Sequence, residues 1–142
     1  MKLLLTILLF VCNMAVFAQA DKVAGDYALI MNTQEGDAFE YTLTLSADGT
    51  FSFHHYSNIK KGIPPEKHFY GKGKWTIEKN VVSFTSDKQT DLDAKQTVDF
   101  SNTKSRFDTK SPRDKTDKVV KTRLRFLSSE IPWMKRIDLD KA

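Results

Sequence analysis

The sequence predicts an all-β fold: an antiparallel meander of eight or nine strands that closes into a barrel or a rolled sandwich. Three observations lead to this prediction. Apolar and polar residues alternate with period two along most of the chain. Turn signals separate the alternating segments at fairly regular intervals, and no long helical pattern follows residue 20. Strands in sequential order tend to close on themselves, because closure removes exposed sheet edges.

Residues 1–20 have the pattern of a secretory signal peptide. Lys2 supplies the positive start, an apolar run extends from Leu3 to Val11, and Ala18-Gln19-Ala20 is a small-x-small cleavage signal. The run is shorter than the roughly 20 apolar residues that cross a bilayer as a helix. We therefore predict a signal-peptide helix, cleavage after Ala20 (after Ala18 as second choice), one β domain over 21–142, and export to the periplasm or the extracellular space.

Cys12 is the only cysteine in the chain. It lies inside the apolar run, and Val11 precedes it where a lipoprotein signal needs Gly, Ala or Ser, so we expect no lipid anchor. Cleavage of the leader would remove Cys12, which excludes disulfide scaffolds, Cys-ligated zinc and cysteine nucleophiles. A domain of this size buries enough apolar surface to fold without such links. No second apolar span follows, so we predict no transmembrane segment after cleavage.

The first half of the domain contains four alternating segments. We predict strands over 26–31, 39–45, 51–56 and 69–77, with a tight turn at Ser46-Ala47-Asp48-Gly49. Residues 58–68 include Ile63-Pro64-Pro65, which cannot join a sheet interior, and are predicted to form a loop. Gly71 and Gly73 fall at inward positions of the fourth strand. They predict a strong bend or the close approach of a neighbouring strand.

The second half is more polar. We predict strands over 81–85, 95–101, 104–109, 120–126 and 133–139, with 104–109 paired to 95–101. Residues 86–95 fit either a short helix or a wide loop, and 110–118 fit a charged turn. The inward positions of the predicted strands are rich in aromatic residues. They are Tyr27, Phe39, Tyr41, Phe51, Phe53, Phe69, Trp75, Phe84, Phe100 and Phe126.

Four short motifs carry a family resemblance. They are Gly25-Asp26-Tyr27, Tyr41-Thr42-Leu43-Thr44-Leu45, Asp48-Gly49-Thr50-Phe51 and Gly73-Lys74-Trp75-Thr76-Ile77. Over about residues 25–85, this series resembles the lipocalin-like (calycin-type) small β-barrel domains of exported bacterial proteins. Tyr27 stands where the family's Gly-x-Trp signature has Trp. The C-terminal third resembles uncharacterised exported bacterial proteins, which supply no function to carry over.

Small eight-stranded barrels are either filled by side chains or hold one small ligand. Phe51, Phe53 and Trp75 would give such a ligand aromatic walls, and His55 would give it a polar group at one end. These four are the candidate ligand-binding residues of an exported binding protein for an apolar small molecule. The alternative is that the rings fill the core and leave no cavity.

Residues 104–125 hold nine basic and three acidic residues. Lys110, Arg113, Lys115 and Lys118 fall on the charged turn, and Arg123 on the outward face of the next strand. They are candidate anion-binding residues, and the alternative function is an envelope interaction module that binds an anionic polymer through this basic face. The acidic residues in the same region favour a plain solvated face. Export argues against nucleic acid as the partner.

The chain has three histidines and lacks the common catalytic motifs. His54 and His55 are neighbours on a strand and point to opposite faces, so they cannot serve one ion together. His68 and Glu66 leave open a zinc or copper site with one of them, but our prediction is no metal and no other cofactor. The chain has no Gly-x-Ser-x-Gly, His-Glu-x-x-His or phosphate-binding glycine loop. We predict that it is not an enzyme, and the sequence leaves its oligomeric state open.

Overall fold

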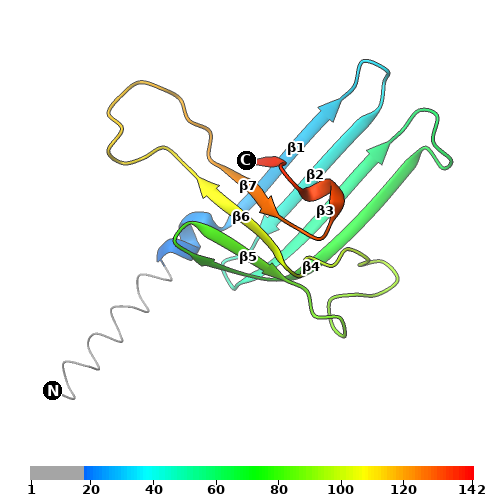
Figure 1. The fold of residues 1–142 in the computed structure, drawn as a ribbon, viewed down its shortest axis with the longest axis horizontal. Coiled ribbons are helices and arrows are strands. Elements are labelled where there is room, and N and C mark those ends of the chain that lie inside the picture. Colours follow the sequence, from blue (N-terminus) through cyan, green and yellow to red (C-terminus); the bar gives the residue numbers. More distant parts are fainter. Residues whose placement is uncertain (1–17) are drawn as a thin grey trace.

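Eight antiparallel strands follow one another around a closed barrel, which confirms the predicted all-β meander (Figure 1). The structure is a computed structural model that describes residues 18–142. The first 17 residues of the predicted leader, including Cys12, lie outside the described part of the chain. Residues 18–23 are helical. Within residues 18–142, no helix combines the length and the apolar character needed to span a membrane.

Each strand pairs with the next in sequence, and the last pairs with the first. The strands are β1 (Gly25–Asn32), β2 (Ala38–Leu45), β3 (Thr50–Asn58), β4 (Glu66–Glu78), β5 (Val81–Thr85), β6 (Thr103–Asp108), β7 (Arg123–Ser128) and β8 (Asp138–Lys141). A 3₁₀ turn, η1 (Pro132–Met134), precedes β8. The predicted loop over 58–68 is shorter than expected, because β3 continues to Asn58 and β4 begins at Glu66.

Local turn chemistry fixes the register of the hairpins. Gly49 has a φ of 90°, and the Asp48 carboxylate accepts a hydrogen bond from the backbone N–H of Thr50 at 2.9 Å. Between β4 and β5, Lys79 and Asn80 have φ values of 49° and 65°. Two successive left-handed residues form the hairpin turn that matches the twist of the flanking strands. The first turn lies where the sequence predicts it, and the second falls between the predicted strands over 69–77 and 81–85.

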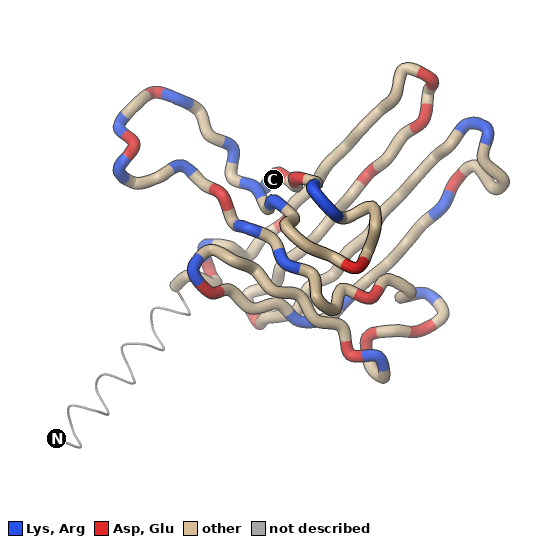
Figure 2. The backbone as a smooth tube through the Cα atoms, viewed as in Figure 1, with Lys and Arg blue, Asp and Glu red and all other residues tan. Residues whose placement is uncertain are grey.

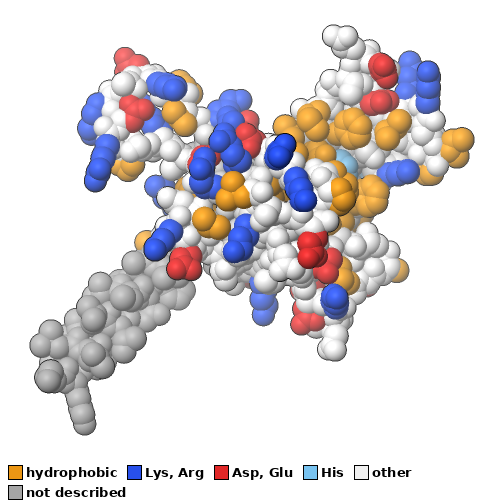
Figure 3. All heavy atoms as spheres, viewed as in Figure 1, with side chains coloured by type: hydrophobic (Ala, Val, Ile, Leu, Met, Phe, Trp, Pro, Cys, Tyr) orange, Lys and Arg blue, Asp and Glu red, His pale blue; other side chains and the backbone are white. Residues whose placement is uncertain are grey.

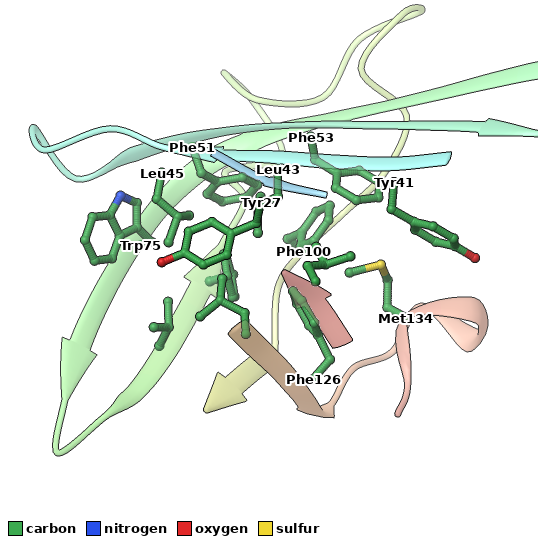
Figure 4. Packing of buried hydrophobic residues seen from close by; sticks show 14 of the residues in the cluster. Tyr27, Tyr41, Leu43, Leu45, Phe51, Phe53, Trp75, Phe100, Phe126 and Met134 are labelled. Carbon is green, nitrogen blue, oxygen red and sulfur yellow. The ribbon is translucent and has the colours of Figure 1, made fainter. Parts of the chain in front are cut away.

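Aromatic rings fill one half of the barrel (Figure 4). Phe51 packs edge to face against Phe84 and Phe100, with ring centroids 5.2 and 5.0 Å apart. Phe84 also packs against Phe126 at 5.7 Å. Trp75 closes this end, where its indole N–H donates to the backbone oxygen of Ser46 at 2.9 Å. All ten aromatic residues predicted to face inward lie in the core or pack against it.

The two halves of the barrel differ in strand length. Strands β1 to β4 have 8 to 13 residues, whereas β5 to β8 have 4 to 6. The four long strands therefore project beyond the four short ones, with two hairpins at the far end (Figure 1). Inward residues on this projection are not covered by an opposite sheet. Phe39 and Phe69 are only half-buried there, and Met31 is 39% exposed.

The predicted strand over 95–101 is wrong. This segment makes one isolated parallel bridge, between Gln96 and Tyr70, and otherwise forms a loop that packs on the barrel. Val98 and Phe100 are buried as the alternation suggested. The backbone N–H of Phe100, however, donates to the Ser86 hydroxyl at 3.0 Å rather than to a strand. Strand β6 consequently pairs with β5 and β7 instead of with this segment, and residues 86–95 form turns and bends.

Two C-terminal boundaries also differ from the prediction. Residues 120–122 belong to the loop after β6, so β7 begins only at Arg123. The predicted strand over 133–139 is η1 followed by the short β8. Pro132 explains the change, because proline lacks the N–H of a sheet ladder and suits the first turn of a helix. Trp133 nevertheless packs against the core.

Candidate functional site

Five aromatic side chains gather at the open end of the barrel, and we call them the aromatic shelf. The shelf consists of Phe39 and Tyr41 on β2, His55 on β3, Phe69 on β4 and Trp133 in η1. Tyr41, His55 and Phe69 are register partners on three adjacent strands, so their side chains stand side by side on the inner face. In Figure 3, hydrophobic side chains gather over the projecting strands at this end.

His55 is the centre of the shelf. Its ring stacks on Tyr41 and on Trp133, with centroids 4.2 and 4.7 Å apart. Phe69 lies at 5.9 Å and Phe39 at 6.5 Å, both nearly parallel to the imidazole. Trp133 also lies within 6.1 Å of Tyr41 and Phe69. The indole from η1 therefore packs over a floor of rings that the long strands supply.

The protonation of His55 follows from its contacts. Burial lowers the pKa of the imidazole below its ordinary value, which favours the neutral ring at neutral pH. Nδ1 lies 3.1 Å from the backbone oxygen of Glu40. Because a carbonyl oxygen can only accept, Nδ1 carries the proton. Nε2 is then an acceptor.

A hollow of about 380 Å³ adjoins the shelf. Phe69, Val98, Ile131, Pro132 and Trp133 give it apolar walls, and the polar residues Thr97, Asp99 and Glu130 line the rest. Leu29 also packs on the core at this end. The hollow can accept a flat apolar group against Phe69 and Trp133, whereas His55 is only 5% exposed and lies behind these rings.

The four predicted ligand-binding residues separate into two places. Phe53 and His55 both contact Trp133, at centroid distances of 5.8 and 4.7 Å. Phe51 and Trp75 instead lie in the filled half, where each is less than 5% exposed. The sequence did not lead us to assign Phe39, Tyr41, Phe69 and Trp133 to the site. The cross-strand register of Tyr41 and Phe69 with His55 was the available signal, whereas nothing in the local pattern places Trp133 over them.

The predicted anion-binding residues also separate. Lys110, Arg113, Lys115 and Lys118 lie on the loop between β6 and β7, which projects from the barrel (Figure 2). Arg123 lies on β7 and its guanidinium pairs with Asp138 at 3.3 Å and Asp140 at 3.5 Å.

Neighbouring cations are paired in the same way. Arg125 lies 3.3 Å from Asp138 and 3.8 Å from Asp108, and Lys121 lies 3.5 Å from Asp140. Two of the three carboxylates, those of Asp138 and Asp140, lie on β8, outside the basic segment 104–125. The strand part of the basic face is therefore largely neutralised, and the uncompensated charge lies on the loop.

Comparison of this chain with protein-family models, with curated proteins and with solved structures returned no match.

Proposed function

We propose that this chain is an exported, lipocalin-like binding protein that holds a flat apolar ligand on the aromatic shelf. The observation that carries the proposal is the set of rings around a neutral imidazole at the end of the barrel where the sheet is uncovered. The other end is packed with its own side chains, so the ligand would sit at the mouth of the barrel rather than deep inside it.

The two tryptophans of the chain allow a direct test. N-phenyl-1-naphthylamine is a suitable probe, because it is flat and apolar. We expect saturable one-to-one binding, with quenching of Trp133 and not of Trp75. Trp75→Phe leaves only the reporter on the shelf, and Trp133→Phe leaves only the reporter in the filled half.

Trp133→Ala should weaken probe binding at least about tenfold, which corresponds to about 1.4 kcal/mol. Leu127→Ala is the matched control, since Leu127 is an apolar side chain that is 50% exposed. Equal affinity in the wild type and in Trp133→Ala would refute the shelf as the site. Native mass spectrometry of the protein from its own host would reveal a ligand that co-purifies.

A second candidate function rests on the loop between β6 and β7. Arg113, Lys115 and Lys118 are exposed and make no ion pair within the described residues. Such a loop would bind an anionic envelope polymer through charge-assisted contacts.

Retention on immobilised heparin tests this candidate. Changing Arg113, Lys115 and Lys118 to Gln should move elution to lower salt, because fewer cations then face the polymer. The matched control changes Lys60, Lys61 and Lys67, three exposed lysines at the other end of the molecule, to Gln. Equal shifts for both triple variants would show attraction by net charge alone and would refute a site on the loop.

A further inference from the structure

The far end of the long strands carries most of the exposed large apolar side chains. Seven such side chains are exposed in the described part of the chain, and four of them lie at this end. Ile30 and Met31 on β1 are 66% and 39% exposed, and Ile59 and Ile63 in the loop between β3 and β4 are 38% and 96% exposed. The register of β1, β2 and β3 puts the end of β1 at the same end of the sheet as this loop (Figure 1).

We call residues 59–65, with the sequence Ile-Lys-Lys-Gly-Ile-Pro-Pro, the tip loop. It ends the β3–β4 hairpin and projects past the aromatic shelf, whose His55 and Phe69 lie on the same two strands (Figure 1). Ile63, the most exposed large apolar side chain of the tip loop, is followed by Pro64 and Pro65, which are also exposed. A single exposed apolar residue is ordinary, but three in succession at the end of a projecting hairpin indicate a contact surface.

The backbone donors of the tip loop are mostly occupied. The N–H of Ile59 donates to the backbone oxygen of Pro65, and the N–H of Gly62 donates to that of Ile59, both at 2.8 Å. The N–H of Lys60 donates to the Asp37 carboxylate at 2.9 Å. The two prolines of the loop have no N–H. Five of the seven residues therefore present no free backbone donor, which lowers the cost of moving the loop from water into an apolar medium.

Basic residues lie beside these apolar side chains at the tip of the hairpin (Figure 2). Lys60 and Lys61 follow Ile59 in the tip loop, and both are exposed. Long lysine side chains can keep their ammonium groups among lipid headgroups while neighbouring apolar side chains lie deeper. Glu35 and Asp37, next to the β1–β2 turn, line a hollow together with the two lysines and offset part of their charge. The tip loop thus combines a large apolar contribution with a moderate attraction to anionic headgroups.

We infer that the tip loop docks the protein on the surface of an anionic lipid bilayer, with the Ile63 side chain below the headgroups and Lys60 and Lys61 among the phosphates. An anionic polymer would pair with the lysines but leave Ile63 in water, whereas a bilayer buries the apolar side chains and also contacts the ammonium groups. In this orientation, the end of the barrel that carries the aromatic shelf faces the membrane. Passage of an apolar ligand between bilayer and shelf would follow only if the proposed function holds, but the docking itself does not depend on it.

Sedimentation with vesicles of phosphatidylglycerol and phosphatidylcholine tests the docking on the exported protein, from which the predicted leader has been removed. We expect saturable binding. Ile63→Ser should lower the partition coefficient at least about tenfold, because the transfer free energy of one isoleucine is lost, and Ile63→Leu should bind as the wild type does. Val119→Ser is the matched control and should leave binding unchanged, since Val119 is 90% exposed but lies on the loop between β6 and β7. Changing Lys60 and Lys61 to Gln should weaken binding to the anionic vesicles at least about threefold and have little effect on pure phosphatidylcholine.

A fluorescent label shows where the tip loop lies when the protein is bound. Ile63→Cys and Val119→Cys, each combined with Cys12→Ser, give two matched single-cysteine proteins for a nitrobenzoxadiazole dye. On vesicles, the emission at position 63 should shift to shorter wavelength and be quenched by nitroxide-labelled lipid, whereas the emission at position 119 should not change.

Three results would overturn the inference. They are the absence of saturable vesicle binding, equal losses of binding for Ile63→Ser and Val119→Ser, and a label that stays in water at position 63 while the protein is bound. A response at position 119 instead would assign the contact to the basic loop between β6 and β7. Vesicle binding is measured without the naphthylamine probe, so its failure leaves the proposed function to its own test.

Discussion

Gly73 on β4 offers the sharpest test of how the barrel is packed. A methyl group at this position would lie 2.0 Å from the backbone oxygen of Thr85 on β5 and 3.0 Å from Cε1 of Phe51. The first contact is with backbone, which cannot move away without disturbing the ladder in which Lys74 and Thr85 are partners. Overpacking of this kind costs about 1–3 kcal/mol, and a backbone obstacle places Gly73→Ala at the upper end, at about 3 kcal/mol.

Gly73→Ala would instead raise the free energy of unfolding if β5 did not lie close to Gly73. An unhindered glycine in a strand is about 0.5–1 kcal/mol less favourable than alanine, so Gly73→Ala would then stabilise the protein. The assay is urea unfolding followed by far-ultraviolet circular dichroism, with Ser52→Ala on the exposed face of β3 as the control. A free energy of unfolding for Gly73→Ala equal to or above that of the wild type would refute the packing described here.

Gly71, two residues earlier, provides a graded comparison. A methyl group there would lie 2.8 Å from Cε2 of Phe100 and 3.1 Å from the backbone oxygen of Val98. The nearest obstacle is a side chain in a loop rather than a paired strand, so it can yield. Gly71→Ala should therefore cost about 1–2 kcal/mol, less than Gly73→Ala. A larger loss of unfolding free energy for Gly71→Ala than for Gly73→Ala would contradict the argument that the Phe100 ring can move and the paired strand β5 cannot.

Three further perturbations follow from single contacts. The pKa of His55 in the folded chain lies below its ordinary 6.5, so the unfolded chain binds the proton more readily. The contribution of His55 to stability should therefore be full above pH 6.5 and should be lost as the pH falls below 6.5. Urea midpoints measured from about pH 7 to 5 should show this fall in the wild type and a flatter dependence in His55→Gln. Asp138→Asn removes the ion pairs with Arg123 and Arg125, which are partly exposed. The free energy of unfolding should therefore fall by about 0.5–1 kcal/mol in low salt and by less in 1 M NaCl. Thermal melts at the two salt concentrations measure the difference. Trp75→Phe removes an indole hydrogen bond and part of a buried ring, so urea unfolding should show a loss of about 1–3 kcal/mol; an unchanged midpoint would mean that Trp75 does not close the filled end.

Period-two alternation was sufficient to predict most strands and the parity of the core. It failed at 95–101, where Val98 and Phe100 are buried with the spacing of a strand but the backbone is bonded elsewhere. Alternation of apolar and polar residues indicates which side chains face the core. A loop that packs on a barrel can show the same alternation although its backbone forms no sheet hydrogen bonds. The Ser86 hydroxyl that receives the Phe100 N–H is distant in sequence, and no local pattern reveals such a partner.

The candidate site was only partly predictable for a related reason. Parity and register bring Tyr41, His55 and Phe69 together, and both can be derived from the sequence once the hairpins are assigned. Trp133 reaches the same place through η1, from the far end of the chain. Its position depends on where the barrel closes and on how the chain turns at Pro132, which are tertiary properties. Asp138 and Asp140 neutralise Arg123 through the β7–β8 pairing, in which Arg123 stands opposite Asp140.

Unequal strand length connects these observations to function. If β5 to β8 were as long as β1 to β4, an opposite sheet would cover the projecting inner face, and its side chains would fill the open end as they fill the other. The long strands instead continue past the point of closure, and one tryptophan covers only part of the rings they carry. A half-covered aromatic surface leaves apolar area in water, which is unfavourable unless something occupies it. The uncovered end of the long strands is therefore where a ligand would gain most from burial, and lengthening β7 and β8 should abolish binding while raising stability.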